Sequence, residues 1–587
     1  MRDTWSLDVL YTGFDDKRWS EDLKELDRCV EAFNVFAGKL SEENGKETIK
    51  EGLELLEKLE SLSMQMLIFC ELRGAADTRD KDSISYEGVL SQKRNQTRAA
   101  ETRFAKYVAE QKDLERYLEE DEFLASYAYL LRNMVQDNRH LLSGDVEEAL
   151  AKMDISGGAA WSSLQGFLTS SVEADCEGKK LTLSEVRNLA YSKEKKVRKA
   201  AYEAELACYD KIKDSVAYAL NSIKMQDISE CELRGFSSPL AKTLYYARMQ
   251  EDTLKALLTA MEEYMPQFWR YLRLKAEKLG YQNGLPWYEL FAPLGKSGKS
   301  YTTEEARDYL ITVFSSFAPD MADMMKRAFA EEWIDFYPRN GKVGGAFCEA
   351  LNSKKEFRVL TNFSGSFSDI VTLAHELGHG YHDFMVHDNE PLNMDYSMPV
   401  AETASTFNEN VITSYAIDHT TDDEEKLALL ESQLSDAAQI MCDIYSRFLF
   451  ESEVVKRRKN SFLFADELNE IMLNAQKKAY GNGLDQNFLH PYMWVCKSHY
   501  YSADLGFYNY PYAFGGLFAR GLYAKYKKEG SAFVEKYKKM LKSTPVMSVE
   551  DVAKICDIDL TDKKFWMMSL HSYDAEIDEF ERLVKQA

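Results

Sequence analysis

The pentapeptide His-Glu-Leu-Gly-His at residues 375–379 carries the clearest chemical signal in the chain. Two histidines four positions apart on a helix lie on the same face, about one turn apart. Their imidazole nitrogens can therefore share one zinc ion, which accepts such ligands at roughly 2.0–2.1 Å. Glu376 follows the first histidine, so its carboxylate can take a proton from a metal-bound water. This pattern predicts a metal centre that hydrolyses amide bonds.

The residues around the pentapeptide predict a helix over about 366–386. Ser366 and Asp369 have the spacing of a capping box just before an apolar run. Gly378 and Gly380 each cost this helix on the order of 1 kcal/mol relative to alanine. We therefore expect a neighbouring helix or a substrate to pack closely against the backbone at these glycines.

The third metal ligand must come from another part of the chain. A metzincin would have glycine at 382 and histidine at 385, but His382 and Met385 stand there. The thermolysin and aminopeptidase patterns require a glutamate about nineteen or twenty residues after the second histidine, but Met398 and Pro399 stand at those positions. These classes are therefore excluded.

The next acidic candidates are Glu390, Glu402 and Glu409. Glu390 lies in a polar loop too close to the first helix to swing back comfortably. Pro399 is a residue favoured in the first turn of a helix, and a second helix starting there could present Glu402 to the metal. Glu409 lies two turns along the same face, where it either orients a metal-bound histidine or faces solvent.

Several segments resemble the M3 family of zinc peptidases, and within it the oligoendopeptidase F group. The two central segments are TLAHELGHGYH at 372–382 and PVAETASTFNE at 399–409. The others are WSLDVLYTGFDDKRWSEDLKEL at 5–26, GGAFC at 344–348, TNFSGS at 361–366 and HYYSADLGFYNYPYAFG at 499–515. The resemblance therefore covers essentially the whole chain.

The resemblance implies roles for individual residues. His375, His379 and Glu402 match the ligands of one zinc ion per chain, and Glu376 matches the general base. A C-terminal loop would bind the carbonyl oxygen as it becomes tetrahedral, since donors aimed at developing negative charge stabilise it. The matching candidates in this loop are His499, Tyr508 and Tyr510, with Phe507 and Tyr512 as alternatives to these tyrosines.

A β-hairpin is predicted next to the helix. Lys342-Val343 and residues 358–360 flank the polar turn at residues 352–355. In the family that the chain resembles, an edge strand beside the zinc helix pairs with the substrate backbone. Gly344 and Gly345 would let a peptide approach closely, although a plain surface hairpin is the alternative.

The remainder of the sequence predicts a mainly α protein. Only 11 prolines in 587 residues, with long Leu/Ala/Glu/Lys-rich stretches, favour helices. We expect an N-terminal helical region at 1–190 and a catalytic region at 191–587. The family resemblance implies two helical lobes, a deep central channel and a small β-sheet beside the zinc-binding helix.

Composition limits the partners and the location. A net charge of −24 disfavours nucleic-acid binding, which needs a basic face. The nine cysteines form no C-x-x-C pair, the N-terminus lacks the apolar run of a signal peptide, and no stretch approaches a membrane span. We therefore expect a cytoplasmic protein with no membrane partner, either a monomer or a small homo-oligomer.

The predicted function is zinc-dependent endopeptidase activity on short, unstructured peptides, because the implied channel would exclude folded proteins. Two alternatives stay open. One is a zinc exopeptidase of the same fold that trims like a carboxypeptidase. The other is a catalytically idle peptide-binding protein.

Overall fold

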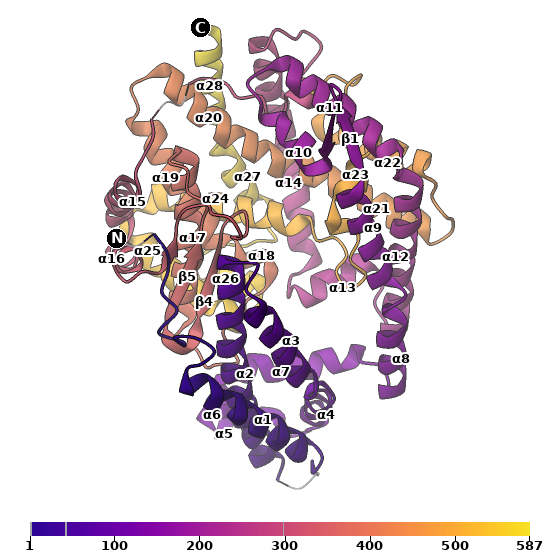
Figure 1. Ribbon diagram of the computed structural model, residues 1–587, viewed down its shortest axis with the longest axis vertical. Coiled ribbons are helices and arrows are strands. Elements are labelled where there is room, and N and C mark those ends of the chain that lie inside the picture. The colour runs from indigo at the N-terminus through magenta and orange to yellow at the C-terminus, as the bar shows by residue number, and fades with distance from the viewer. Residues whose placement is uncertain (1–2, 41–43, 297–298, 587) are drawn as a thin grey trace.

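Helices make up 71% of the chain, which confirms the predicted mainly α fold. A computed structural model describes residues 3–40, 44–296 and 299–586. The helices form two lobes, with the N-terminal helices (indigo) at the bottom of Figure 1 and most of the remaining chain above them.

The N-terminal lobe is a set of short and long helices around its own apolar core, which extends to Leu131. The longest, α2, buries Leu53, Leu59 and Met66 along one side. The helices are α1 (Lys17–Ala37), α2 (Gly45–Ala76), α3 (Lys81–Asn95), α4 (Arg98–Ala109), α5 (Leu114–Glu120), α6 (Glu122–Ser126) and α7 (Ala128–Asp137).

A second core joins residues 174–223 to residues 450–503, which are distant in the sequence. The predicted boundary at residue 190 falls inside the first of these segments and stays a prediction. The elements here are α8 (Gly144–Asp154), α9 (Gly158–Ser171), β1 (Glu173–Cys176), β2 (Lys179–Thr182), α10 (Leu183–Asn188), α11 (Lys195–Asp210), α12 (Lys213–Arg234) and α13 (Pro239–Tyr246).

The largest core runs from Ile228 to Val584 and contains the motif helix α17 (Phe367–Val386). The remaining helices, of which α23 and most buried side chains of α22 belong to the second core, are α14 (Glu251–Lys278), α15 (Thr303–Phe317), α16 (Pro319–Ala330), α18 (Met398–Ala401), α19 (Thr403–His419), α20 (Asp423–Ala438), α21 (Ile444–Arg458), α22 (Ala465–Tyr480), α23 (Met493–Cys496), α24 (Tyr510–Glu529), α25 (Ser531–Ser543), α26 (Val549–Lys554), α27 (Lys563–His571) and α28 (Asp574–Gln586).

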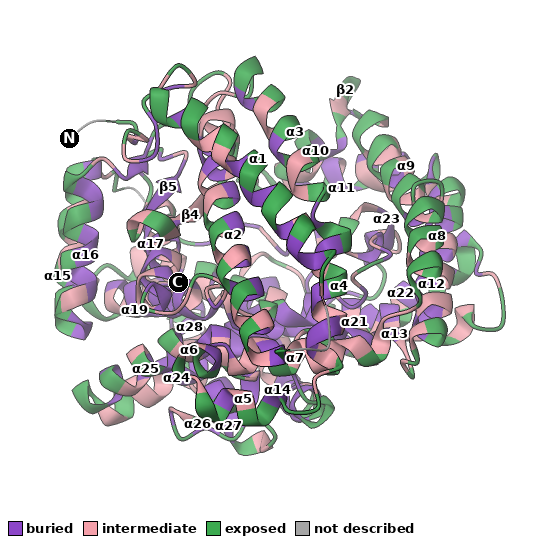
Figure 2. Ribbon diagram, turned by 90° about the horizontal axis from the view of Figure 1, so that it is seen from below, coloured by how far each residue is buried: buried purple, intermediate pink, exposed green. Residues whose placement is uncertain are grey.

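Burial separates inner from outer helices. Helix α24 is buried at nearly every position from Tyr510 to Tyr523, whereas α3 buries only Ser83 and Leu90. Figure 2 shows the exposed outer surface of α3 in green. No helix in the described ranges is both long and apolar enough to cross a membrane.

A small three-stranded sheet lies between α17 and the N-terminal lobe. Its order is β3 (Ile334–Asp335), β5 (Glu356–Leu360) and β4 (Phe347–Leu351), with β4 antiparallel to β5 at the edge. Phe357 and Val359 join the main core, and Leu360 joins the N-terminal core, because successive strand residues point to opposite faces. The sheet thereby ties the motif helix to the other lobe.

The predicted start of the hairpin at Lys342-Val343 is wrong. Strand β4 begins at Phe347, because Gly345 has a φ of +81° that interrupts extended pairing. The side chain of Lys342 is instead buried and forms an ion pair with Asp335 at 2.7 Å. The predicted turn is present as a short 3₁₀ segment at Asn352–Lys354.

Candidate metal centre

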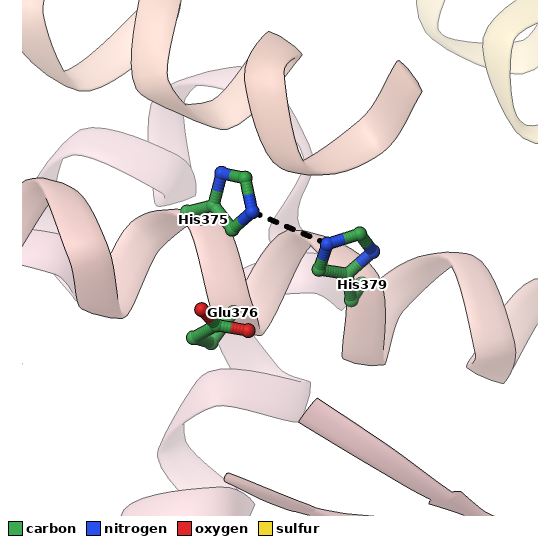
Figure 3. A group of neighbouring side chains, drawn as sticks. All are labelled: His375, Glu376 and His379. Carbon is green, nitrogen blue, oxygen red and sulfur yellow. Dashed lines mark hydrogen bonds between the residues drawn. The ribbon is translucent and has the colours of Figure 1, made fainter. Parts of the chain in front are cut away.

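The motif helix presents its two histidines as the spacing predicts. The capping box of Ser366 and Asp369 is formed, with the Asp369 N–H donating to the Ser366 hydroxyl at 3.2 Å. One turn of helix separates His375 from His379, and their Nε2 atoms face each other at 3.2 Å. Figure 3 shows both imidazoles on one side of α17.

The carboxylate of Glu402 lies beside the two imidazoles and comes from a break between two helices. It is the residue between α18 and α19, so the predicted continuous helix from Pro399 is interrupted there. Its Oε2 lies 3.2 Å from Nε2 of His379 and 3.4 Å from Nε2 of His375. The Ser405 hydroxyl, which the sequence argument missed, donates to the same oxygen at 2.8 Å.

Close packing of α17 on α19 brings Glu402 next to His375 and His379. A Cβ on Gly378 would lie 2.6 Å from the carbonyl oxygen of Ala404, so glycine lets the two backbones touch. The side-chain amide of Asn408 also donates to the carbonyl oxygen of Ala374 at 3.0 Å. The expected close packing at Gly378 is therefore an interhelical contact, while at Gly380 the neighbour is the ring of Phe357.

The spacing of the three groups suits a tetrahedral zinc ion. Two ligand atoms bound at roughly 2.0–2.1 Å with tetrahedral angles lie about 3.3 Å apart. The three separations among His375, His379 and Glu402 are 3.2, 3.2 and 3.4 Å. Glu376 also has an oxygen within 4.8 Å of the imidazole nitrogens, but Figure 3 shows it below the two imidazoles, which face each other. Glu402 therefore completes the ligand set better.

Glu409 contacts His375 on the side of the ring that faces away from the centre. Its Oε1 lies 2.7 Å from Nδ1 of His375, the nitrogen that does not face the centre. A hydrogen bond at Nδ1 fixes the ring and leaves Nε2 free for a metal. Of the two readings of Glu409, the structure places its carboxylate against His375, with 38% of the side chain still exposed.

The electrostatics of the centre favour a cation. Burial opposes charge on His375, but the hydrogen bond and charge of Glu409, with the charges of Glu376 and Glu402, raise the pKa of His375 to about 9. Burial also opposes charge on Glu402, yet its contacts with His379 and the charge of His375 lower its pKa to about 2. Three carboxylates around two imidazoles thus stabilise positive charge, which a metal ion would supply.

Glu376 is buried, with 5% of its surface exposed. Burial raises the pKa of its carboxyl, while the nearby His375 and His379 act in the opposite direction. Cys348 is the second residue of β4, and burial, then the charges of Asp383 and Glu376, raise the pKa of its thiol. The edge strand and Glu376 therefore lie on the same side of the motif helix.

The third histidine of the segment belongs to the core. His382 is completely buried, its Nε2 pairs with the Thr544 hydroxyl at 2.8 Å, and its ring stacks on Tyr396 at 4.0 Å. Burial lowers the pKa of His382 to about 3. This residue is a neutral packing group and no candidate ligand.

The predicted glycines lie at the start of the edge strand. Gly344 and Gly345 are both exposed, and a Cβ on either would meet nothing within 4 Å. The side-chain amide of Asn362 donates to the carbonyl of Gly345 at 2.8 Å, which holds this loop against the sheet. The free edge of β4 follows directly at Phe347.

The C-terminal loop assembles a cluster of one histidine and two tyrosines. The ring of His499 stacks on Tyr508 at 5.3 Å, and its Nε2 lies 3.3 Å from the hydroxyl of Tyr512. Burial, then Tyr508, then the charge of Glu402 raise the pKa of Tyr512 to about 12. A Cβ on Gly515, one turn after Tyr512, would lie 3.3 Å from Cβ of Glu402. The cluster therefore lies beside the metal centre.

Tyr510 does not join this cluster. Only 1% of its surface is exposed, and its buried hydroxyl has no hydrogen-bond partner among the described residues. The start of α24 turns Tyr510 into the main core, while Tyr512 points to His499. Helix geometry decides between them, because residues two apart face different sides.

Comparisons with known proteins identify the family of this chain. The model of peptidase family M3 matches residues 188–572, and an Oligopeptidase F model matches residues 109–173. The Bacillus subtilis protein named oligopeptidase PepF is 23% identical over 99% of this chain and 87% of its own length. A Lactococcus lactis oligoendopeptidase F homolog is 25% identical over 99% of this chain and 97% of its own.

Solved structures share the fold. A crystal structure from Chlamydophila abortus superposes with a TM-score of 0.85 at 20% identity, covering 99% of this chain and 98% of that one. The structure of oligoendopeptidase-F from Enterococcus faecium gives a TM-score of 0.71 at 18% identity, covering 97% and 99%.

Proposed function

From the chain's membership of peptidase family M3, which makes it a peptide hydrolase, we propose that it is a zinc-dependent endopeptidase acting on short, unstructured peptides. The observation that carries the proposal is the near-equilateral triangle of Nε2, Nε2 and Oε2 from His375, His379 and Glu402. A bound zinc ion would polarise the scissile carbonyl and favour attack by water near neutral pH.

In this proposal Glu376 moves the proton. It takes a proton from the attacking water and delivers it to the leaving amine, so no covalent intermediate is required. Burial raises the pKa of its carboxyl, and a pKa closer to neutrality suits a group that must both accept and return a proton. Glu409 holds His375 in the orientation that directs Nε2 to the centre.

His499 and Tyr512 are the proposed donors to the carbonyl oxygen as it gains charge. The proximity of α24 to Glu402 supports a position of this pair beside the centre, and each donor of this kind can contribute several kcal/mol. Tyr508 stacks against His499 and positions the ring. Tyr510 has no such role, because its hydroxyl is buried in the core.

The free edge of β4 is the proposed guide for the substrate backbone. An extended peptide can add to an exposed sheet edge through main-chain hydrogen bonds, with loose side-chain preference. Gly344 and Gly345 leave open space at the beginning of that edge. The names of the Bacillus and Lactococcus relatives support oligopeptides as substrates. The channel, the cytoplasmic location and the oligomeric state stay predictions.

A graded ladder of peptides from a folded protein, together with that protein intact, tests this function. Cleavage positions are read by mass spectrometry with zinc-loaded protein, with chelator, with zinc restored, and with Glu376→Gln. We expect internal cuts in the short peptides only, lost with chelator and regained with zinc. The Glu376→Gln variant should bind zinc but lose at least about 100-fold in kcat.

Each other outcome points to a different function. Removal of residues one by one from a terminus would identify an exopeptidase. Binding of peptides without cleavage by the zinc-loaded chain would identify an idle peptide binder. Equal cleavage of the intact protein and its peptides would contradict the size limit.

A further inference from the structure

A cavity of about 700 Å³ lies next to the proposed centre. It is bounded by the first turns of α17, by α19 and α20, and by Gly516 of α24. Phe367 and Val371, two turns and one turn before His375, line it together with Glu409. Glu409 lines the cavity and contacts Nδ1 of His375, so only this one carboxylate separates the cavity from the first histidine of the centre.

The polar lining of this cavity has excess negative charge and acceptors without donors. Asp436 is accessible to solvent, and its carboxylate has no hydrogen bond or ion pair with the described residues. Desolvation by the surrounding cavity walls, then the charges of Glu409 and Glu431, raise the pKa of Asp436 to about 7, and a cation in the cavity would favour its charged form. The side-chain oxygen of Gln433 is buried and likewise has no partner in the described part of the chain.

Charge in the lining is only partly balanced. Glu425, the third carboxylate, accepts a hydrogen bond from Thr420. Lys299 is the one lysine or arginine among the described lining residues, and its Nζ sits 4.6 Å from the ring centroid of Tyr301. Glu409 is already paired with His375, and the charge of Lys299 offsets that of Glu425. Among the described lining residues, Asp436 is the carboxylate left without a cation, so a positively charged occupant would stabilise its ionised form.

Aromatic rings form another part of the lining. Tyr309 makes edge contacts with Tyr301 at 6.4 Å, with Phe367 at 6.2 Å and with Tyr415 at 5.8 Å. Ring faces attract ammonium and guanidinium groups, most strongly where water is excluded. A metal ion is the wrong occupant, because the carboxylates that line the cavity form no group of potential ligands close enough to share an ion in the described ranges.

We propose that this cavity binds a positively charged side chain of the substrate, arginine or lysine, at a position near the scissile bond, and that Asp436 selects it. The inference rests on the proposed peptidase function. Carboxylates and the Gln433 oxygen accept hydrogen bonds, and a guanidinium or ammonium group is a donor only. The aromatic rings then pack against the apolar stem and the charged head.

The test compares peptides that differ only in arginine, lysine, citrulline, norleucine or glutamate, placed in turn at each position around the cut. We expect kcat/KM for arginine to exceed that for its neutral isostere citrulline by about tenfold at one position. Asp436→Asn should bring this ratio close to one, and Asp436→Lys should favour glutamate there instead. The matched control is Glu424→Gln, an exposed carboxylate on the same helix, which should keep the ratio. Thermal unfolding confirms that each variant is folded.

Equal kcat/KM for arginine and citrulline at every position, with all peptides cleaved, would overturn the cationic pocket and leave the peptidase function intact. An unchanged ratio in folded Asp436→Asn would overturn the role of Asp436. If the zinc-loaded natural chain cuts no peptide at all, the proposed peptidase function is wrong, and so is this inference.

Discussion

Replacing Glu409 with glutamine removes the charge that supports His375 while keeping the shape of the side chain. Loss of such a partner typically costs about 10–100-fold in metal affinity. The Glu409 side chain is 38% exposed, so solvent screens part of its charge, and the amide oxygen can still accept from Nδ1 at the 2.7 Å position. We therefore expect about a tenfold loss of zinc affinity for Glu409→Gln, or ~1.4 kcal/mol. Glu409→Ala removes the acceptor and should approach about 100-fold.

Zinc affinity is measured by competition with a chromogenic chelator at fixed pH, and kcat/KM is measured on one peptide with zinc in excess. The matched control is Asp418→Asn on the same helix, whose carboxylate is 59% exposed and 3.7 Å from the Lys527 ammonium. It should bind zinc like the natural chain. If both Glu409 variants also bind zinc with unchanged affinity, Glu409 does not support the metal ligand and our reasoning is wrong.

Three further predictions concern the loop, the helix contact and a buried histidine. Tyr512→Phe should lower kcat by about 100-fold with little change in KM, whereas Tyr510→Phe should leave kcat nearly unchanged. The reverse result would identify Tyr510 as the donor. Gly378→Ala should cost ~1–3 kcal/mol of unfolding free energy and weaken zinc binding, because its Cβ would lie 2.6 Å from the Ala404 carbonyl oxygen. The control is Gly88→Ala, whose added Cβ would meet nothing within 4 Å and should stabilise the folded chain by up to ~1 kcal/mol. Equal melting temperatures of the two variants would contradict the close contact at Gly378. Burial lowers the pKa of His382 from 6.5 to about 3, so between these pH values the unfolded chain binds the extra proton and stability falls with falling pH, by up to ~1.4 kcal/mol per pH unit. His382→Gln should flatten this part of the stability curve and exposed His571→Gln should not, while identical slopes would refute the assignment.

Local interactions explain which features could be predicted from the sequence. The helix around the motif follows from a capping box and an apolar run, both of which act within a few residues. The common face of His375 and His379 follows from the helical repeat alone. The hairpin was predictable from its polar turn, but its first strand was placed too early, because the left-handed conformation of Gly345 cannot be read from the letter G.

The partners of the motif depended on tertiary packing. The sequence by itself determined the mainly helical fold, the motif helix and a short set of acidic candidates for the third ligand. Only the tertiary structure shows that Glu402 lies at a helix break facing both imidazoles and that Glu409 contacts His375. It also decided that Tyr512, rather than Tyr510, approaches His499, and that Asp436 borders a cavity beside the centre. Helical periodicity is set by hydrogen bonds four residues apart, whereas these meetings depend on how distant helices cross, which packing of the whole core determines.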